Sequence, residues 1–487
     1  MKLTGAEILA EELINQGAEV IFGYPGAAVS DIWNAIARDS RTRLIMTSRE
    51  DGAAHAADGY ARASGKTGVV IATSGPGATN LVTGIAAAHA DSQPVIAVTG
   101  NVGFDLIGRD SFQEADIVSI TNPITKHNYL VRSADELALI VREAFTIANS
   151  GRKGPVLIDI PKDVQLRSAQ YAPLPKFTPR TPPEPASDLI GQVLQLIAAA
   201  DRPLILSGGG VTFGDASVEL RAFAESRGIP VAVTMPGLGS IPVTHPLYLG
   251  MTGVYGTERA NAALRDADLI IAVGVRFSDR LALTSFPPII HIDIDRSELG
   301  KNTTPVLAVH SDAKTALRLL GGIPANAERV LPAQRTILLV TDVGNHQISA
   351  VTQFPFEHPR QLISSCGLGA MGFGMGAAVG AAIACPQSRT LLVTGDGSFH
   401  MNLAELATAV SLRLPITVVV VNNQSLGMLN MPFCRATDFV AAAKAFGAEG
   451  FTVSRRGELD AAISKTFSLN AVCVIEYQCG GQTYGDN

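Results

Sequence analysis

Cysteine and charge are both scarce in this chain of 487 residues, and a basic tract is lacking. The five cysteines form no CxxC pair and no secretory framework, so a reducing compartment is the simpler expectation. Charged residues make up 17% of the chain, and 38 lysines and arginines against 44 aspartates and glutamates give a net charge of −6. This charge pattern argues against nucleic acid or an anionic membrane as a partner.

Long apolar runs and targeting segments are lacking as well. Residues 1–13 pass directly into an amphipathic helix with Thr4 as its N-cap, and they resemble neither a signal peptide nor an Arg-rich transit segment. No run in the sequence is apolar and long enough to cross a membrane. We therefore expect a cytoplasmic protein without a membrane anchor.

Glycine and hydrophobic residues are abundant instead. The 47 glycines and the 47% of hydrophobic residues fit a large, well-buried α/β enzyme. The chain is too long for one core, and its length predicts about three domains. Residues 171–185 contain six prolines and few large aliphatic side chains, which predicts an extended linker. We place a first domain at 1–170, a central domain at 186–325 and a third, shortened domain at 326–487.

Short apolar runs alternate with helical patterns or glycine-rich turns in these domains. The clearest segments are a helix at 5–16, strands at 20–23, 68–72, 94–99 and 155–159, and strand-and-turn segments at 203–210, 229–240, 269–280 and 289–295. Alternation of this kind predicts an α/β protein with doubly wound parallel sheets.

Residues 390–428 are the most informative stretch. They predict a strand, a tight turn, a helix and a second strand, at 391–393, 395–397, 402–412 and 416–421. Ligands of such a βαβ unit bind beyond the carboxyl ends of the strands. Both strand ends carry an oxygen ligand here, the carboxylate of Asp396 and the amide oxygen of Asn423.

The turn at Asp396 is suited to a phosphate and a metal ion. Gly395 and Gly397 let the backbone approach a phosphate closely, and Ser398 opens a helix whose N-terminus favours an anion. Two oxygen ligands, a nearby backbone carbonyl and a diphosphate together suit octahedral Mg²⁺. The alternative is an ordinary βα turn, which a bare Gly-Asp-Gly would favour. Gly-Asp-Gly-Ser followed at this separation by Asn-Asn after a valine-rich strand is much more specific.

This stretch resembles the diphosphate-binding motif of thiamine diphosphate (ThDP) enzymes. The rest of the chain resembles the catalytic subunit of acetohydroxyacid (acetolactate) synthase, most closely at 123–131 and 150–165. The resemblance implies that Asp396, Asn423 and the main-chain carbonyl of Ser425 hold Mg²⁺. It also implies decarboxylation of pyruvate and transfer of the hydroxyethyl unit to a second 2-ketoacid, pyruvate or 2-ketobutyrate, in branched-chain amino acid biosynthesis.

Glu50 follows a predicted strand and precedes a helix of small residues, where its carboxylate would be partly desolvated. From the sequence alone an exposed, ion-paired glutamate is favoured. The resemblance reverses this preference, because the family's matching glutamate hydrogen-bonds the pyrimidine ring nitrogen of ThDP and promotes its imino tautomer. The family's Arg-His-Glu-Gln is Ser48-Arg49-Glu50-Asp51 here, so the glutamate is kept while its neighbours differ.

The resemblance implies further contacts with ThDP. The turn at 74–80, with Gly75, is expected beside the pyrimidine half, although an ordinary βα connection would look the same. Met428 is expected to bend the cofactor, whereas Met371 either lies near the pocket or fills the core. The expected ThDP-binding residues are Tyr24, Pro25, Gly26, Glu50, Pro76, Asn80, Val343, Gly344, Asn345, His346, Gly369, Met371, Gly395, Asp396, Gly397, Ser398, Asn423, Ser425, Leu426, Gly427 and Met428.

Four further residues are expected at the reaction centre beside Glu50. The resemblance places Phe112 at the pyruvate pocket, Gln113 near the reacting carbonyl and Lys162 at the channel to the active site. Arg276 is suited to a bidentate grip on the carboxylate of the second ketoacid, and a surface ion pair is the alternative. His127 is given no role, because a lone histidine in a loop is more often structural.

Glycine-rich turns follow several strands of the central domain, and together they favour a cofactor cleft more than a lone Gly-Gly-Gly would. The resemblance implies FAD here, since residues 276–280 match the family's Arg-Phe-Asp-Asp-Arg with one change, at Ser278. FAD would be structural, because joining two 2-ketoacids after decarboxylation involves no net redox change. The expected FAD-binding residues are Arg152, Gly208, Gly209, Gly210, Thr234, Gly274, Arg276, Asp293 and Asp312.

Three segments depart from the family pattern. Residues 325–335 replace a longer connection, 480–487 replace a longer tail, and a tryptophan-containing segment with a mobile lid is missing after Met428. The family's preference for 2-ketobutyrate depends on that tryptophan, so acceptor preference cannot be carried over. A missing lid would admit water and predicts release of acetaldehyde or slow turnover. The alternative is that intervening residues are absent from the sequence given.

We expect a homodimer or homotetramer, because Glu50 and Asp396 lie in different domains and the family places its cofactor between subunits. A small regulatory subunit is a further partner to consider, although no residue pattern reveals one. Two alternative functions stay open. One is another ThDP carboligase or decarboxylase, such as a sulfoacetaldehyde acetyltransferase-like or flavin-free acetolactate synthase. The other is a non-catalytic ThDP- and FAD-binding subunit, which the shortened C-terminal region favours and the intact Glu50, Asp396 and Asn423 oppose.

Overall fold

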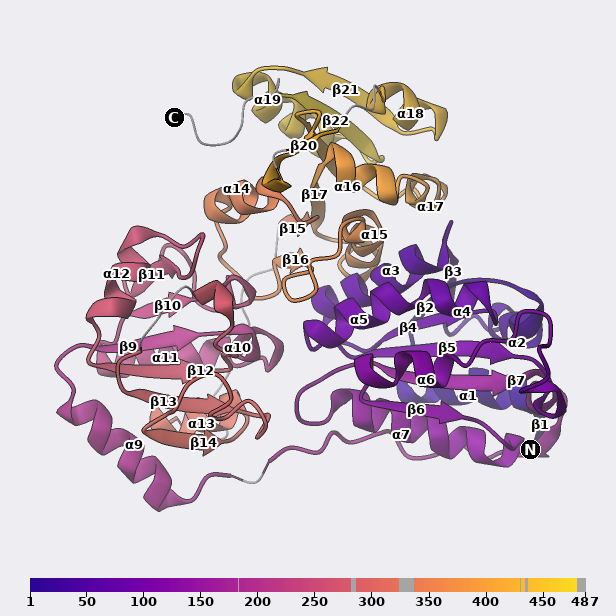
Figure 1. The fold of residues 1–487 in the computed structure, drawn as a ribbon, viewed down its shortest axis with the longest axis horizontal. Helices are drawn as coiled ribbons and strands as arrows, with labels where there is room; N and C mark the ends of the chain where they lie inside the picture. Colours follow the sequence, from indigo (N-terminus) through magenta and orange to yellow (C-terminus); the bar gives the residue numbers. More distant parts are fainter. Residues whose placement is uncertain (183, 282–285, 324–336, 430, 434–436, 480–487) are drawn as a thin grey trace. The chain divides into compact units, whose positions relative to one another are not determined.

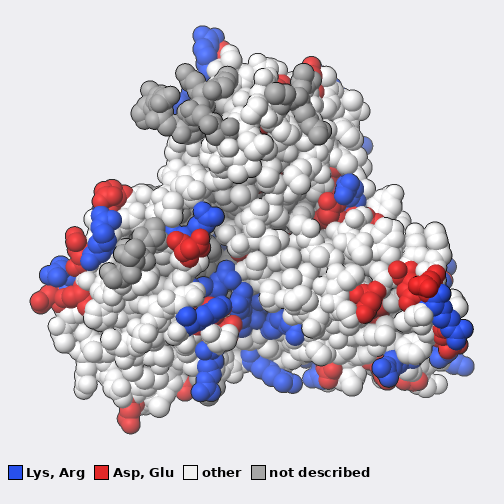
Figure 2. Space-filling view, in the orientation of Figure 1, with Lys and Arg blue, Asp and Glu red and all other residues white. Residues whose placement is uncertain are grey.

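The computed structural model describes residues 1–487 except 183, 282–285, 324–336, 430, 434–436 and 480–487. The described residues form three six-stranded sheets flanked by helices (Figure 1), which confirms the predicted α/β class with three doubly wound domains. Uncharged side chains cover most of the face shown in Figure 2, and charged residues of either sign lie in scattered groups.

The chain divides into two compact units. Residues 1–179, 336–347 and 363–487 form the first unit, and residues 180–335 and 348–362 form the second. The first unit therefore contains two of the three sheets. The described residues between 171 and 186 form no helix or strand, and the expected boundary between central and third domains at 325–326 lies outside the described residues.

The N-terminal sheet has the strand order β3-β2-β4-β5-β7-β6, and all neighbouring strands are parallel. Its strands are β2 (Val20–Tyr24), β3 (Arg43–Met46), β4 (Gly68–Ala72), β5 (Val95–Asn101), β6 (His127–Leu130) and β7 (Val156–Pro161). Its helices are α1 (Gly5–Gln16), α2 (Ser30–Ala37), α3 (Glu50–Ser64), α4 (Pro76–Asn80), α5 (Val82–Ala90), α6 (Ile117–Thr121), α7 (Leu137–Asn149) and α8 (Lys162–Leu166). The short strands β1 (Lys2–Thr4) and β8 (Ser168–Gln170) pair antiparallel beside it.

The sheet is covered on both faces because its strands are apolar on both sides. Val69 and Ile71 of β4 belong to the core under α1, α2 and α7, whereas Val70 and Ala72 belong to the core under α3 and α5. Successive side chains of a strand point to opposite faces, so a continuous apolar run fits a doubly covered parallel strand. The expected cap of α1 is confirmed, since Thr4 and Glu7 form a capping box.

The C-terminal sheet has the order β16-β15-β17-β18-β22-β21. Its strands are β15 (Ile337–Thr341), β16 (Leu362–Ser364), β17 (Arg389–Gly395), β18 (Ile416–Asn422), β21 (Glu449–Val453) and β22 (Cys473–Gln478). Its helices are α14 (Asn345–Gln353), α15 (Phe373–Ala384), α16 (Asp396–Met401), α17 (Glu405–Ser411), α18 (Phe439–Ala445) and α19 (Arg456–Ser468). The short strands β19 (Ser425–Leu426) and β20 (Met431–Pro432) form an antiparallel pair just after β18.

Two boundaries in this domain differ from the expectation. The helix after the Asp396 turn begins at Asp396, so Ser398 lies inside it, and a second helix starts only at Glu405. Asn402 separates the two helices. Its φ of −136° is not helical, and its side chain donates to the Gly372 carbonyl oxygen at 3.0 Å. The small residues of 373–384 form α15, which begins after Gly372 with its φ of +86°.

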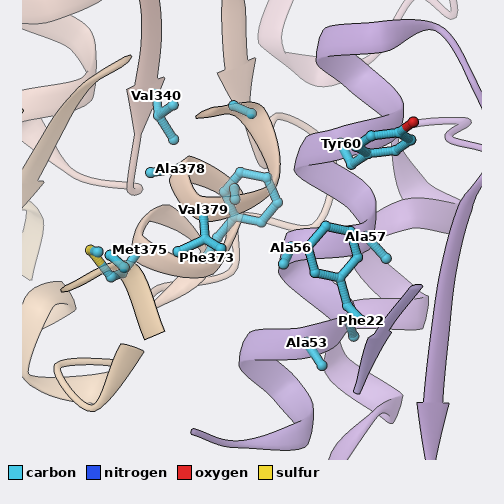
Figure 3. Packing of buried hydrophobic residues seen from close by; sticks show 14 of the residues in the cluster. Phe22, Ala53, Ala56, Ala57, Tyr60, Val340, Phe373, Met375, Ala378 and Val379 are labelled. Carbon is cyan, nitrogen blue, oxygen red and sulfur yellow. The ribbon is translucent and has the colours of Figure 1, made fainter. Parts of the chain in front are cut away.

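The two domains of the first unit are joined by the packing of α3 against α15 (Figure 3). Small residues allow this close contact. A Cβ atom on Gly59 would lie 2.3 Å from the Ala377 carbonyl oxygen, and one on Gly380 would lie 1.9 Å from the Ala56 carbonyl oxygen. Side chains of Phe22 and Phe373 extend the apolar contact on either side of it. The glycine and alanine content of both helices is thus explained by helix packing.

A buried charge cluster lies at the same contact. Arg62 on α3 donates to Asp58 at 2.7 Å and to Asp91 at 2.9 Å, and all three side chains are almost fully buried. Arg62 also donates to the Ser364 carbonyl oxygen at 2.7 Å, and Asp91 accepts from the Cys366 backbone N–H at 2.9 Å. Removing one partner of a buried ion pair leaves the other charge without compensation.

Substituting Arg62 with Ala is therefore expected to lower the free energy of unfolding of this unit by about 3–5 kcal/mol. Urea unfolding followed by circular dichroism measures the change. The matched control is Arg41→Ala, because Arg41 pairs with Glu11 at 2.7 Å on an exposed surface. That substitution should cost less than about 1 kcal/mol. Equal losses in the two variants would contradict the structural role of the buried cluster.

The second unit contains the central sheet, with the order β11-β10-β9-β12-β13-β14 and parallel neighbours throughout. Its strands are β9 (Pro203–Ser207), β10 (Val231–Val233), β11 (Tyr248–Met251), β12 (Leu269–Val273), β13 (Ile289–Asp293) and β14 (Leu307–His310). Its helices are α9 (Ser187–Ala199), α10 (Gly209–Phe213), α11 (Ser217–Arg227), α12 (Glu258–Asp266) and α13 (Ala313–Leu320).

Candidate functional site

Glu50 is the first residue of α3, and its side chain is half-buried. The Asn80 side-chain amide donates to Glu50 Oε2 at 2.9 Å, which brings together two residues expected at the cofactor. A Cβ atom on Gly77 would lie 3.3 Å from Glu50 Oε1 and 2.7 Å from the Thr73 methyl group, so the turn after β4 lies against the carboxylate. The structure thus assembles Glu50 with the turn at 74–80.

The turn at Tyr24, Pro25 and Gly26 follows β2, the neighbour of β4. It packs on the same threonine, since a Cβ atom on Gly26 would lie 2.4 Å from Thr73 Cβ. The Ala28 N–H donates to Thr73 Oγ1 at 3.3 Å and holds the turn in place. Parallel neighbouring strands end at one edge of a sheet, and this edge is where ligands of such folds bind.

The loop at 108–116 brings Gln113 to the same edge. A Cβ atom on Gly75 would lie 2.9 Å from Gln113 Cα, and Gln113 itself has a left-handed φ of +60°. Glu114 organises the loop, because its carboxylate accepts from the N–H groups of Gly108 and Ser111. Phe112 is not brought together with these residues, since its side chain is 87% exposed.

Lys162, the first residue of α8, contacts the segment that follows the Gly26 turn. Its Nζ donates to the Ala27 carbonyl oxygen and to Ser30 Oγ, both at 2.9 Å, and pairs with Asp31 at 2.5 Å. The cation therefore fixes the segment 27–31 against the edge of the sheet. His127, to which no role was given, stacks edge-on against Tyr129 within β6.

Asp396 and Asn423 lie at the ends of adjacent parallel strands. In the ladder between β17 and β18 Gly395 stands opposite Val421, so Asp396 and Asn423 both follow this last paired position closely. The Asp396 carboxylate is buried and accepts from the Gly397 N–H at 2.9 Å. Burial raises the pKa of this carboxyl, although backbone hydrogen bonds oppose the shift. Asn423 Oδ1 accepts from the Ser425 N–H at 3.1 Å.

His346 and Asn345 surround the same turn from the start of α14. A Cβ atom on Gly395 would lie 3.0 Å from His346 Nδ1, and one on Gly427 would lie 2.7 Å from Asn345 Nδ2. Burial lowers the pKa of His346 to about 4, so the imidazole is neutral at pH 7. Its Nε2 atom is buried and has no hydrogen-bond partner among the described residues.

Met371 and Leu426 line the other side of the turn. A Cβ atom on Gly397 would lie 2.9 Å from Leu426 Cδ2 and 3.7 Å from Met371 Cε. Gly369 has φ +73°, and a Cβ atom on it would just reach Val343 at 4.0 Å. Met371 and Met428 are both partly exposed, at 37% and 47%. Met371 is therefore not simple core filler, and Ser398 lies buried inside α16 behind this surface.

These residues fit a diphosphate with a hard cation. Glycine at 395 and 397 lets His346 and Leu426 lie directly against the turn, and the unpartnered His346 Nε2 offers a polar atom next to it. The buried Asp396 carboxylate is a ligand that Mg²⁺ prefers, while Asn423 and main-chain carbonyls add oxygen atoms. The described residues contain no group of three His, Cys, Asp or Glu side chains placed for a metal. The proposed ligands do not require such a group, because they include an amide oxygen and a main-chain oxygen besides the Asp396 carboxylate.

The residues expected to bind FAD gather at one edge of the central sheet. Each of them is the last residue of a strand or lies within three residues after one, and the strands concerned are β9, β10, β12, β13 and β14. The residues are Gly208, Gly209, Gly210, Thr234, Gly274, Arg276, Asp293 and Asp312. A Cβ atom on Gly208 would lie 2.0 Å from the Gly274 carbonyl oxygen, and Gly274 has φ +62°. The Arg276 guanidinium forms no ion pair within the described residues. Arg152 belongs to the first unit, where it donates to Ser92 Oγ at 2.8 Å.

Two buried carboxylates near these sites were missed by the sequence reasoning. Asp159 inside β7 accepts from Thr99 and Asn101 at 2.7 and 2.6 Å, and burial raises its pKa to about 7. Glu405 of α17 is fully buried and contacts the segment before Glu50. An acidic residue directly within an apolar strand was the available signal for Asp159. Glu405 lies in an ordinary amphipathic pattern, which gives no such signal.

Comparison with known protein families gives three consecutive matches along the chain. Residues 3–120 match the N-terminal TPP binding domain of thiamine pyrophosphate enzymes, residues 190–320 match their central domain, and residues 342–477 match their C-terminal TPP binding domain. In the part of the chain that the structure describes, no helix has the length and apolarity needed to cross a membrane.

Among curated proteins the chain is similar to plant acetolactate synthases. It is 44% identical over 475 residues to acetolactate synthase 3, chloroplastic, of Brassica napus, covering 87% of this chain and 72% of that protein. It is 41% identical over 532 residues to acetolactate synthase 1, chloroplastic, of Oryza sativa subsp. japonica, covering 95% and 82%. The Arabidopsis thaliana protein is 43% identical over 475 residues, covering 87% and 71%.

Proposed function

Because the chain belongs to the acetolactate synthase family of thiamine pyrophosphate enzymes, we propose that it converts two molecules of pyruvate to acetolactate and carbon dioxide. With 2-ketobutyrate as the second ketoacid it would form the corresponding acetohydroxyacid. The observation that carries the proposal is the buried Asp396 beside Asn423 at the ends of adjacent strands, in a chain with this identity to acetolactate synthases. The reaction serves branched-chain amino acid biosynthesis.

Thiamine diphosphate, the same compound as thiamine pyrophosphate, would supply a carbon nucleophile for the ketoacid carbonyl and an acceptor for the electron pair that carbon dioxide leaves behind. In the proposal Asp396, Asn423 and the Ser425 carbonyl hold Mg²⁺, which binds the diphosphate. The neutral imidazole of His346 and the backbone at Gly395 and Gly397 complete the diphosphate cradle.

Glu50 holds a proton in a hydrogen bond with the pyrimidine ring nitrogen and so favours the tautomer that activates the cofactor. The Asn80 amide orients this carboxylate from one side. Gln113 donates to the reacting carbonyl oxygen from the loop at 108–116. Phe112 of the same loop, which is exposed in the chain by itself, would line the pyruvate pocket only with the ketoacid bound. Lys162 keeps the 27–31 segment at the entrance to the site in place.

Arg276 binds the carboxylate of the second ketoacid through its guanidinium. FAD would bind at the glycine-rich edge of the central sheet. The turns at this edge pack closely, since a Cβ atom on Gly208 would collide with the Gly274 carbonyl oxygen. The flavin has a structural role, because the reaction changes no net oxidation state. We further propose a homodimer or homotetramer in the cytoplasm.

Product analysis tests the proposed function. The protein is incubated with ¹³C-labelled pyruvate, ThDP, Mg²⁺ and FAD, and the products are identified by NMR. Labelled acetolactate is the expected product. Acetaldehyde alone would overturn the carboligase assignment and indicate a decarboxylase that lets water into the site. Bound ThDP without turnover would instead indicate a binding subunit. A flavin absorption spectrum of the purified protein tests the FAD assignment separately.

A further inference from the structure

The helix that carries Glu50 has an unusual beginning. α3 starts at Glu50, but its N-cap residue Arg49 makes no side-chain cap hydrogen bond. The cap comes from the other domain of the first unit, where Glu405 is the first residue of α17. Glu405 accepts from the Arg49 N–H at 2.9 Å and from the Ser48 N–H at 3.1 Å. A carboxylate that accepts from N–H groups at a helix start stabilises that start.

The Glu405 carboxylate has a closely fitted site. It is fully buried, and Thr408 Oγ1 donates to its Oε2 at 2.6 Å. Ser48 Oγ donates to the Ala404 carbonyl oxygen at 2.8 Å, which ties the two segments together a second time. A Cβ atom on Gly52 would lie 2.2 Å from Glu405 Oε1. Only glycine at position 52 therefore lets the carboxylate reach the start of α3.

Other charged groups nearby do not take over this role. The Arg49 guanidinium pairs with Asp51 at 2.9 Å and leaves the Glu405 carboxylate to backbone donors and Thr408. Burial raises the pKa of Glu405, while the hydrogen bonds from Thr408, Ser48 and Arg49 act in the opposite direction. A buried carboxylate with this set of donors is costly to lose, because each N–H would be left without a partner.

We propose that Glu405 is a positioning residue for Glu50. By capping α3 it fixes the carboxylate of Glu50, the next residue after the capped Arg49 N–H. Glu405 itself lies outside the residues expected to touch the cofactor, so its effect on the reaction would pass through Glu50. The inference rests on the proposed function in so far as it takes Glu50 to be the activating acid.

Glu405→Ala in the full-length protein tests the proposal. In the protein without cofactor, amide hydrogen exchange at 48–49 is expected to become about tenfold faster, because two hydrogen bonds to a carboxylate are lost. With ThDP and Mg²⁺ the exchange rate of the ThDP C2 proton should fall about tenfold. The dissociation constant of ThDP should change by less than about threefold, since Asp396 and its neighbours are untouched.

Gly52→Ala is a second way to remove the hydrogen bonds between the Glu405 carboxylate and the start of α3. Alanine favours a helix by about 1 kcal/mol over glycine, so α3 itself should not weaken. Its methyl group would displace the Glu405 carboxylate, and we expect both exchange rates to change in the same direction as in Glu405→Ala. Glu405→Gln, which keeps an acceptor oxygen, should change them by less than about threefold. Gly52→Ala also keeps the proposal testable if Glu405→Ala does not fold.

The matched control is Thr4→Ala, which removes the cap of α1 in the same unit. It should leave amide exchange at 48–49 and C2-proton exchange unchanged. Unchanged amide protection at 48–49 in both Glu405→Ala and Gly52→Ala would overturn the proposal. Equal slowing of C2-proton exchange by Thr4→Ala would also overturn it. If the parent protein shows no C2-proton exchange, the proposed function fails, while the amide measurement still tests the cap.

Discussion

Glu50→Gln should slow acetolactate formation by about 10²–10⁴-fold, the range that a positioned acid–base group contributes. The amide keeps the size of the side chain and can still accept from Asn80, whose amide donates to Glu50 Oε2 at 2.9 Å. It cannot share a proton with the cofactor ring nitrogen in the way a carboxyl group does. Initial rates at saturating pyruvate, ThDP and Mg²⁺ measure the loss as kcat.

The control for this variant is Glu7→Gln, which makes the same change in the first turn of α1. Glu7 accepts from the Thr4 N–H at 2.8 Å and has no part in the proposed site. We expect its kcat to stay within about twofold of the parent value, since surface caps affect stability and not chemistry. A loss of less than tenfold in Glu50→Gln would show that Glu50 does not activate the cofactor.

Asp396→Asn is expected to weaken the binding of ThDP with Mg²⁺ by at least about 100-fold. Substitutions beyond the ligands of a metal already cost 10–100-fold in affinity, and Asp396 is proposed as a ligand itself. Titration calorimetry with ThDP at fixed Mg²⁺ measures the dissociation constant. Asp438→Asn is the matched control, because Asp438 also starts a helix of this domain, where it accepts from the Ala441 N–H at 2.8 Å.

Asp396→Asn weakens cofactor binding, but it should not destabilise the folded protein without cofactor. Burial raises the pKa of Asp396, so the folded state disfavours the charged form above the carboxyl's ordinary pKa. At pH 7 removal of that charge should leave the unfolding midpoint unchanged or raise it. Ligand at 100 times its dissociation constant adds about 2.7 kcal/mol to the parent protein and little to the variant. Equal stabilisation of both by ThDP with Mg²⁺ would contradict the metal assignment.

The fold and the diphosphate turn could be predicted because both depend on local patterns. The valine-rich strand at 416–421 and the turn at Asp396 each carry their own signal, and parallel pairing then places Asp396 and Asn423 at one edge. The run of glycine and alanine at 373–384 is a further local pattern, and in α15 Gly380 meets the Ala56 carbonyl oxygen as close helix packing requires.

The contacts between domains could not be predicted, because they join residues far apart in the chain. Glu405 and the Ser48 N–H meet across 357 positions, and no periodicity in either segment indicates the partner. The cluster of Arg62, Asp58 and Asp91 reaches the other domain in the same way, because Arg62 donates to the Ser364 carbonyl oxygen across 302 positions and Asp91 accepts from the Cys366 N–H across 275. Arg62 lies in a helix of small residues that gives no sign of its partners, and the fold buries its guanidinium between the carboxylates of Asp58 and Asp91.

Exchange of the ThDP C2 proton for deuterium in the parent protein tests the central claim most directly. The protein is incubated with ThDP and Mg²⁺ in deuterium oxide without pyruvate, quenched in acid and examined by NMR. The account predicts exchange faster than that of free ThDP by orders of magnitude, with the acceleration lost in Glu50→Gln. Exchange at the rate of the free cofactor, with ThDP shown to be bound by calorimetry, would contradict it.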